Sequence, residues 1–167
     1  TGSNGGFAEY VKVPKGHVLH LPKEITLREA AGIEPATVGC FGLMRGNITA
    51  GDTVAVLGAG SIGQFAIQSA KLFGASKVIA IDILPDKLEL AKKLGADEVI
   101  NGKEVDVVKR LHEIVPRGVD LAVDCAGSKF TEIEALQVAR NAGQVVFVGI
   151  SGTDLPIPAD VFEGRIL

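Results

Sequence analysis

The sequence predicts a doubly wound α/β domain, in which helices cover both faces of a parallel β-sheet. From Gly51 onward, short apolar runs rich in β-branched residues alternate with segments of helical periodicity. The connections are short, so each strand–helix–strand unit needs a right-handed crossover. The 167 residues and the hydrophobic share of 47% are sufficient for one well-buried domain with short additions.

Five apolar runs are expected to form the strands. The run TVAVLG opens the series, and its nearly continuous apolar character is typical of a strand buried on both faces. The runs KVIAID, DEVIN, VDLAVDC and QVVFVGI follow it along the chain. The expected strands therefore span residues 53–58, 77–82, 97–101, 119–125 and 144–150.

The segments between these strands are expected to be helices that end near glycine. The first has a broad apolar face and stops at Gly74, whereas the second has Pro85 in its first turn and stops at Gly95. The third is marked by valine and leucine at helical spacing, and the fourth stops at Gly143. Their expected spans are 61–73, 85–94, 105–115 and 131–142.

The first fifty residues follow another pattern. Residues 7–13 and 17–22 read as extended segments and residues 25–33 as a helix, but together they form no strand–helix–strand unit. We therefore expect a boundary, with residues 1–33 as the end of a different domain and residues 34–167 as the α/β domain.

Charge and hydropathy exclude several functional classes. The net charge is −3 and no basic cluster exceeds the pair Lys92 and Lys93, so we expect no nucleic-acid partner. No apolar run approaches the roughly 18 residues of a membrane span, and the first residues lack the pattern of a signal peptide. Cys40 and Cys125 are expected to be packed, reduced thiols in a cytoplasmic protein that does not contact membranes.

A glycine-rich loop follows the first expected strand. The order G-x-G-x-x-G assigns a tight turn to Gly58, close approach of a pyrophosphate to Gly60, and close helix–strand packing to Gly63. Ser61 and Ile62 open the next helix, whose free N–H groups face a bound phosphate. The alternative is a purely structural turn, but the strand before the loop and the helix after it favour dinucleotide binding.

An acidic residue stands where a dinucleotide site needs one. Asp82 ends the second expected strand, about twenty residues after Gly63. Its carboxylate can accept hydrogen bonds from the ribose hydroxyls and would repel a 2′-phosphate. No arginine occurs in residues 83–86, so the sequence predicts NAD rather than NADP as the cofactor.

Six stretches resemble, in this order, the zinc-dependent medium-chain dehydrogenases, and the similarity is greatest to the sorbitol and polyol-phosphate (galactitol-1-phosphate-like) branch. The resemblance covers nearly the whole chain and implies a Rossmann sheet preceded by a short remnant of a GroES-like catalytic domain. The stretches are GGFAEYVKVP, IEP, GDTVAVLGAGSIG, KLGADEVIN, GVDLAVDCAG and VVFVGI.

The resemblance implies a chemistry and a set of partners. It implies an oxidoreductase that transfers a hydride from a secondary alcohol, such as a polyol, to NAD, while zinc polarises the alcohol oxygen. Glu34 of the IEP stretch matches the family's carboxylate beside the zinc. The alternative for Glu34 is an acid stabilised by a helix N-terminus. A homo-oligomer is expected.

The ends of the last two strands are expected to line the cofactor groove, because ligands bind beyond the carboxyl ends of parallel strands. By resemblance, the groove residues are Ala126, Gly127, Val148, Gly149 and Ile150, with the nicotinamide toward the last three.

Departures from the family are also expected to matter. Its zinc-ligand motifs would precede Thr1 and its sixth strand would follow Leu167, so we expect a partial chain that is inactive alone and contains no catalytic residues. Phe41 stands where the branch usually has histidine. The alternatives are a zinc-free quinone or enoyl reductase of the same superfamily and a non-catalytic module that senses NAD(H).

Overall fold

A computed structural model describes residues 5–152, 154–157 and 159–161. The chain divides into two compact units, residues 1–33 and residues 34–167. No helix in the described ranges is long and apolar enough to cross a membrane.

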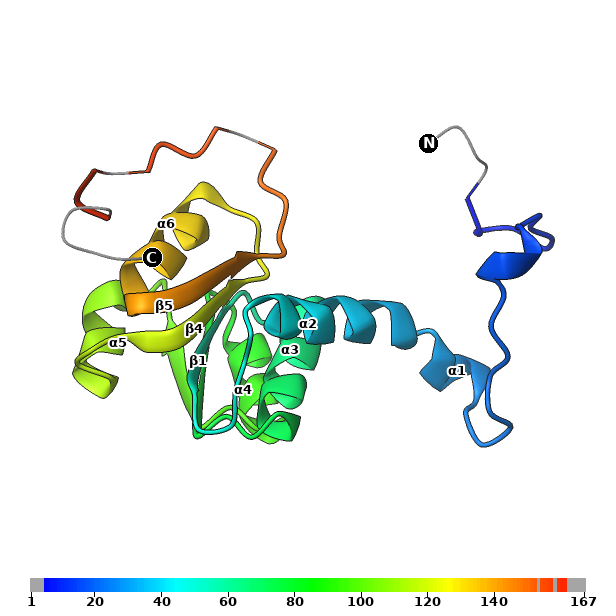
Figure 1. The fold of residues 1–167 in the computed structure, drawn as a ribbon, viewed down its shortest axis with the longest axis horizontal. Coiled ribbons are helices and arrows are strands. Elements are labelled where there is room, and N and C mark those ends of the chain that lie inside the picture. The colour runs from blue at the N-terminus through cyan, green and yellow to red at the C-terminus, as the bar shows by residue number, and fades with distance from the viewer. Residues whose placement is uncertain (1–4, 153, 158, 162–167) are drawn as a thin grey trace. The chain divides into compact units, whose positions relative to one another are not determined.

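The larger unit contains a five-stranded parallel sheet with the order β3-β2-β1-β4-β5 (Figure 1). The strand β1 lies at the centre, where Val56 pairs with Ala80 of β2 on one side and Val123 of β4 on the other. The doubly wound α/β prediction is confirmed. The strands are β1 (Thr53–Leu57), β2 (Lys77–Asp82), β3 (Glu98–Asn101), β4 (Val119–Asp124) and β5 (Ala139–Phe147).

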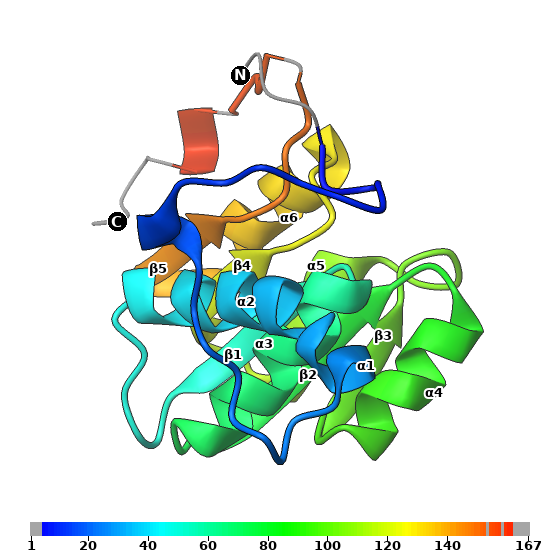
Figure 2. The same cartoon turned by 90° about the vertical axis from the view of Figure 1, so that its right-hand side faces the viewer.

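Helices cover both faces of this sheet, and each face has its own apolar core. Leu43 of α2 and Ile67 of α3 belong to one core, and Leu111 of α5 and Val138 of α6 belong to the other. In Figure 1, α3 and α4 lie on one side of β1 and α5 and α6 on the other; Figure 2 views the first side. The helices are α2 (Ile33–Arg45), α3 (Ser61–Leu72), α4 (Pro85–Lys93), α5 (Val107–Ile114) and α6 (Lys129–Val138).

Asp120 ties three strands together at the edge where they begin. Its carboxylate accepts hydrogen bonds from the Thr53 N–H at 2.8 Å and from the Arg140 Nε–H at 2.6 Å. Burial alone would raise the pKa of Asp120, but these hydrogen bonds outweigh it and lower the pKa to about 2. The ion pair of Asp120 with Arg140, together with the hydrogen bond from Thr53, therefore fixes the end of the sheet at which the strands begin.

The last helix and strand differ from the sequence-based expectation. The predicted helix 131–142 ends instead at Val138, because Ala139 pairs with Val119 and Arg140 bonds to Asp120. The strand predicted at 144–150 lies earlier in the chain, because β5 begins at Ala139 and ends at Phe147. The N–H groups of the next two residues turn together toward the Asp124 carbonyl oxygen.

The smaller unit contains little regular structure. Its elements are a single 3-10 turn, Lys15–His17, and the helix α1 (Leu27–Ala30), which is capped reciprocally by Thr26 and Glu29. The extended segments predicted at 7–13 and 17–22 form no strand within residues 5–33, because a strand needs a hydrogen-bonded neighbour and none is present there. The helix predicted at 25–33 is a single turn.

Candidate functional site

Two glycines of the loop are required by the fold itself. Gly58 has φ of +91°, and a Cβ there would lie 2.8 Å from the backbone nitrogen of Ala126. A Cβ on Gly63 would collide with the carbonyl oxygen of Gly58. These residues perform the turn and the helix–strand packing that the motif predicts for them.

Gly60 is different, because nothing in the fold requires a glycine at this position. Its φ of −70° is open to any residue, and a Cβ would meet no atom within 4 Å. Gly60 caps α3, and Ser61 and Ile62 follow it in the first turn, which contains no acidic residue and receives no side-chain cap. The first N–H groups of an α-helix have no partner within the helix, and beside them the Cβ position of Gly60 is open space.

Asp82 holds this loop in place. Its Oδ2 accepts a hydrogen bond of 2.7 Å from the Ala59 N–H, and its Oδ1 accepts from the N–H groups of Ile83 and Leu84 at 2.7 and 2.9 Å. A carboxylate oxygen can accept two hydrogen bonds, so Oδ2 retains one free position. Asp82 thus combines a structural role, which the sequence did not indicate, with capacity for a ligand hydroxyl.

Gln64 holds the glycine loop through side-chain hydrogen bonds, a role that the sequence analysis did not predict. Its side chain is buried, and its Nε2 donates to the carbonyl oxygens of Ala59 at 3.0 Å and Lys87 at 2.8 Å. The glycine loop is thereby tied to the first turns of α4. A polar residue directly after the last glycine of the motif, on the buried side of a helix, was the available signal.

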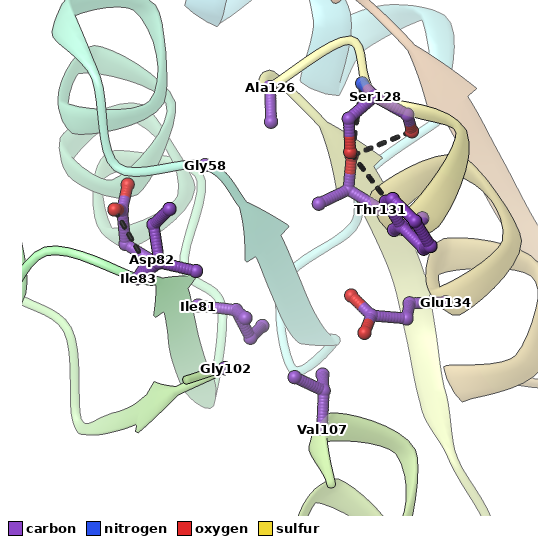
Figure 3. A pocket seen from close by; sticks show the side chains of 11 residues that line it. Gly58, Ile81, Asp82, Ile83, Gly102, Val107, Ala126, Ser128, Thr131 and Glu134 are labelled. Atoms are coloured by element: carbon purple, nitrogen blue, oxygen red, sulfur yellow. Dashed lines mark hydrogen bonds between the residues drawn. The ribbon is translucent and has the colours of Figure 1, made fainter. Parts of the chain in front are cut away.

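A cavity of about 540 Å³ opens at the carboxyl-end edge of the sheet (Figure 3). Of the predicted site residues, Gly58, Asp82 and Ala126 line it. The cavity lining also includes residues near the strand ends and residues from the start of α6, which the sequence analysis did not predict. The additional lining residues are Ile81, Ile83, Gly102, Val107, Ser128, Phe130, Thr131 and Glu134.

Glu134 is the acidic group of the α6 wall. Figure 3 shows its carboxylate directed into the cavity, across from the β2 end that carries Asp82. Burial raises the pKa of Glu134, and the charges of Asp106 and Asp124 raise it further. Among the described residues, none donates a hydrogen bond or offers a cation to this carboxylate.

Of the predicted residues beyond β4 and β5, Ala126 lines this cavity, and the lining does not include Gly127 or residues 148–150, which form a backbone junction after the strand ends. Asp124 is fully buried and accepts hydrogen bonds from the N–H groups of Ala126 at 3.2 Å and Gly127 at 3.0 Å. Burial nevertheless raises the pKa of Asp124. A Cβ on Gly127 would lie 2.5 Å from the Ile150 nitrogen and 2.9 Å from the carbonyl carbon of Gly149, so the two chain segments need glycine to approach.

The remaining groups of this junction point in different directions. Val148 packs toward α2, where a Cβ on Gly42 would meet its side chain at 2.7 Å, and the Ile150 side chain is exposed. Cys125, directly after β4, has its pKa raised to about 12 by burial and by the charge of Asp124.

Glu34 lies in the first turn of α2 with an exposed side chain. Within residues 5–152, 154–157 and 159–161, no three or more His, Cys, Asp or Glu side chains are grouped to hold a metal ion. In this part of the chain Glu34 is a carboxylate with no ligand set around it, so these residues by themselves do not fit a metal ion.

Comparisons with known proteins agree with this geometry. The sequence model of the family described as "Zinc-binding dehydrogenase" matches residues 61–165. Sorbitol dehydrogenase of Bacillus subtilis (strain 168) is 36% identical over 156 residues, which are 92% of this chain and 44% of that protein. An alcohol dehydrogenase of Geobacillus stearothermophilus is 39% identical over 156 residues, 93% of this chain and 45% of that protein.

Solved structures show the same similarity. Galactitol-1-phosphate dehydrogenase from Escherichia coli superposes with a TM-score of 0.88 at 34% identity, covering 96% of this chain and 46% of that chain. A zinc-binding dehydrogenase from Sinorhizobium meliloti 1021, solved bound to NADP, gives the same TM-score and identity and covers 96% and 48%. The chain spans less than half the length of each of these relatives, and it belongs to the zinc-binding dehydrogenase family.

Proposed function

We propose that this chain is the NAD-binding portion of a zinc-dependent alcohol or polyol dehydrogenase, which transfers a hydride from a secondary alcohol to NAD. The observation that carries the proposal is Gly60. Its backbone conformation and its packing would accept a side chain, yet glycine leaves the helix N-terminus of α3 bare. Room for an anion at a helix N-terminus is what pyrophosphate binding requires.

The other groups fit a dinucleotide that extends from this point. The pyrophosphate would lie at the N–H groups after Gly60, and the adenosine ribose would donate a hydroxyl to the free position on Asp82 Oδ2. The apolar cavity beyond Asp82 would hold the adenine. The nicotinamide would extend the other way, toward the backbone of residues 148–150.

Two carboxylates favour NAD over NADP. Asp82 and Glu134 both border the cavity, and residues 83–86 supply no arginine to neutralise a 2′-phosphate. The NADP in the Sinorhizobium meliloti structure makes NADPH the necessary competitor in any test.

In the whole protein, Glu34 would stand beside the zinc ion, and the metal would supply a Lewis acid that lowers the pKa of the alcohol. The substrate would be a small alcohol or polyol, in line with the names of the relatives, and the whole protein would be a cytoplasmic homo-oligomer. Residues 1–33 would belong to its catalytic domain.

A titration of the 167-residue chain with NADH and with NADPH, followed by nicotinamide fluorescence, tests the proposal. We expect saturable NADH binding and NADPH binding weaker by roughly tenfold or more. Asp82→Ala should weaken NADH binding roughly tenfold, because a hydrogen bond to a charged group is lost, and should narrow the gap to NADPH.

The matched control is Asp86→Ala, which removes an exposed acid four positions along the chain and should leave both affinities unchanged. Because Asp82 also holds the Ala59 N–H, circular dichroism must show that each variant is folded. A folded chain that binds neither cofactor would refute the proposal, and tighter binding of NADPH would replace NAD by NADP.

A further inference from the structure

We infer that Glu134 recognises the exocyclic amino group of adenine, so that this chain distinguishes adenine from purines that carry an oxygen at the same position. The inference rests on the proposed function and adds a specificity-determining residue to it. It begins from the composition of the cavity in Figure 3, in which the α6 wall carries one carboxylate, Glu134, beside the hydroxyl groups of Ser128 and Thr131, which bond to each other.

The cavity has the size and surface of a site for a flat aromatic ring. Its volume of about 540 Å³ lies within the roughly 300–1,000 Å³ that small-molecule sites occupy. Ile81, Ile83, Val107 and Phe130 supply apolar walls. Such walls favour a ring that stacks, and they leave polar recognition to the few polar groups present.

Glu134 is a partly buried acid on α6, next to residues of the apolar core. Ala135 and Val138 of the same helix are buried in the core between α6 and the sheet, and Glu134, four residues before Val138, lies on the same helical stripe. A partly buried carboxylate without a hydrogen-bond donor is costly. In the described part of the chain its charged neighbours are the acids Asp106 and Asp124, which raise that cost.

A ligand that offsets this cost must bring N–H or O–H donors and no negative charge to the α6 wall. Phosphate and carboxylate groups are excluded there by repulsion. The ribose hydroxyls would donate to Asp82, which lies on the opposite side of the cavity, so they are not available to Glu134. The amino group of adenine remains as a donor attached to a ring that fits the apolar walls, and a carboxylate accepts from it directly.

Reduced nicotinamide hypoxanthine dinucleotide, in which a carbonyl oxygen replaces this amino group, provides the test. The unmodified chain should bind NADH at least about tenfold more tightly than this analogue, because two acceptors would face each other in the analogue complex. Glu134→Gln should reduce the ratio to about one, since an amide can donate to the oxygen as well as accept from the amino group.

Two further variants complete the experiment. Glu134→Ala should also lose the discrimination, and Glu113→Gln, which changes an exposed carboxylate on α5 outside the cavity, should keep it. NADH binding with an equal affinity for the analogue, or an unchanged ratio in Glu134→Gln, would overturn the assignment of Glu134 alone. A chain that binds no NADH would overturn the proposed function together with it.

Discussion

The two edges of the sheet use acidic residues in opposite ways. At the amino-end edge, Asp120 is enclosed by donors from β1 and β5, and its pKa falls to about 2. At the carboxyl-end edge, Glu134 faces an open cavity without a donor, and its pKa rises. One carboxylate stabilises the fold, whereas the other is held at a cost to it.

This difference shows where the fold leaves capacity for a ligand. Asp82 combines features of Asp120 and Glu134. Three backbone N–H groups donate hydrogen bonds to its carboxylate, and one acceptor position stays open. Asp120, which accepts hydrogen bonds from β1 and β5, holds strands together, whereas Asp82 and Glu134, which keep acceptor positions open, border the cavity at the carboxyl ends of the strands.

The largest effect is expected from Gly63→Val at the carboxyl-end edge. The new side chain would collide with the carbonyl oxygen of Gly58, and backbone atoms cannot move aside as a flexible side chain can. We expect a loss of about 3 kcal/mol or more in the free energy of unfolding, measured by urea denaturation. Gly16→Ala, at a glycine with no atom near its Cβ position, is the control. A stable Gly63→Val protein would show that the loop does not pack against its helix as described.

A smaller effect is expected at the amino-end edge from Asp120→Asn. The depressed pKa of Asp120 means that its carboxylate stabilises the fold above the unfolded pKa of about 3.8, and this contribution disappears as the pH falls through about 2. We expect Asp120→Asn to cost about 2 kcal/mol at pH 7 and little at pH 2. Urea denaturation at several pH values measures the difference. A cost that stays constant with pH would mean that the charge of Asp120 contributes nothing.

The smallest effect on stability is expected from Gly60→Ala. Alanine is a poorer helix cap than glycine, but it also restricts the unfolded chain, so the two changes nearly cancel within about 1 kcal/mol. NADH affinity should nevertheless fall about tenfold, because the methyl group occupies the space of the pyrophosphate. Unchanged NADH binding in this variant would remove the main support for the proposed function.

The fold could be predicted where the pattern is local. The strands β1 to β4 contain short apolar runs, and Gly74 and Gly95 follow the helices α3 and α4 closely, so periodicity and turn residues determine these elements. The end of α6 could not be predicted, because Gly143 suggested a later stop. The chain leaves the helix earlier since Arg140 reaches Asp120, twenty residues away in the sequence.

The candidate site likewise contains a part that could be predicted from local sequence and a part that could not. The glycine loop is a contiguous motif, and its members could be recognised one after another. Glu134 was missed because its importance depends on which face of α6 meets the sheet. The spacing of Thr131, Glu134, Ala135 and Val138 places them on one helical stripe, and an acid within a stripe that is otherwise apolar or small was the available signal.

The position of Cys125 has a practical consequence for experiments on this chain. With a pKa of about 12, its thiol stays protonated at neutral pH, and alkylating reagents attack the thiolate form. Modification of Cys125 should therefore be slow in the folded chain, and local opening around the end of β4, which removes the burial that raises this pKa, should accelerate it. If a bound dinucleotide suppresses this opening, the alkylation rate of Cys125 should fall as the dinucleotide binds, which would make the thiol a kinetic reporter of occupancy.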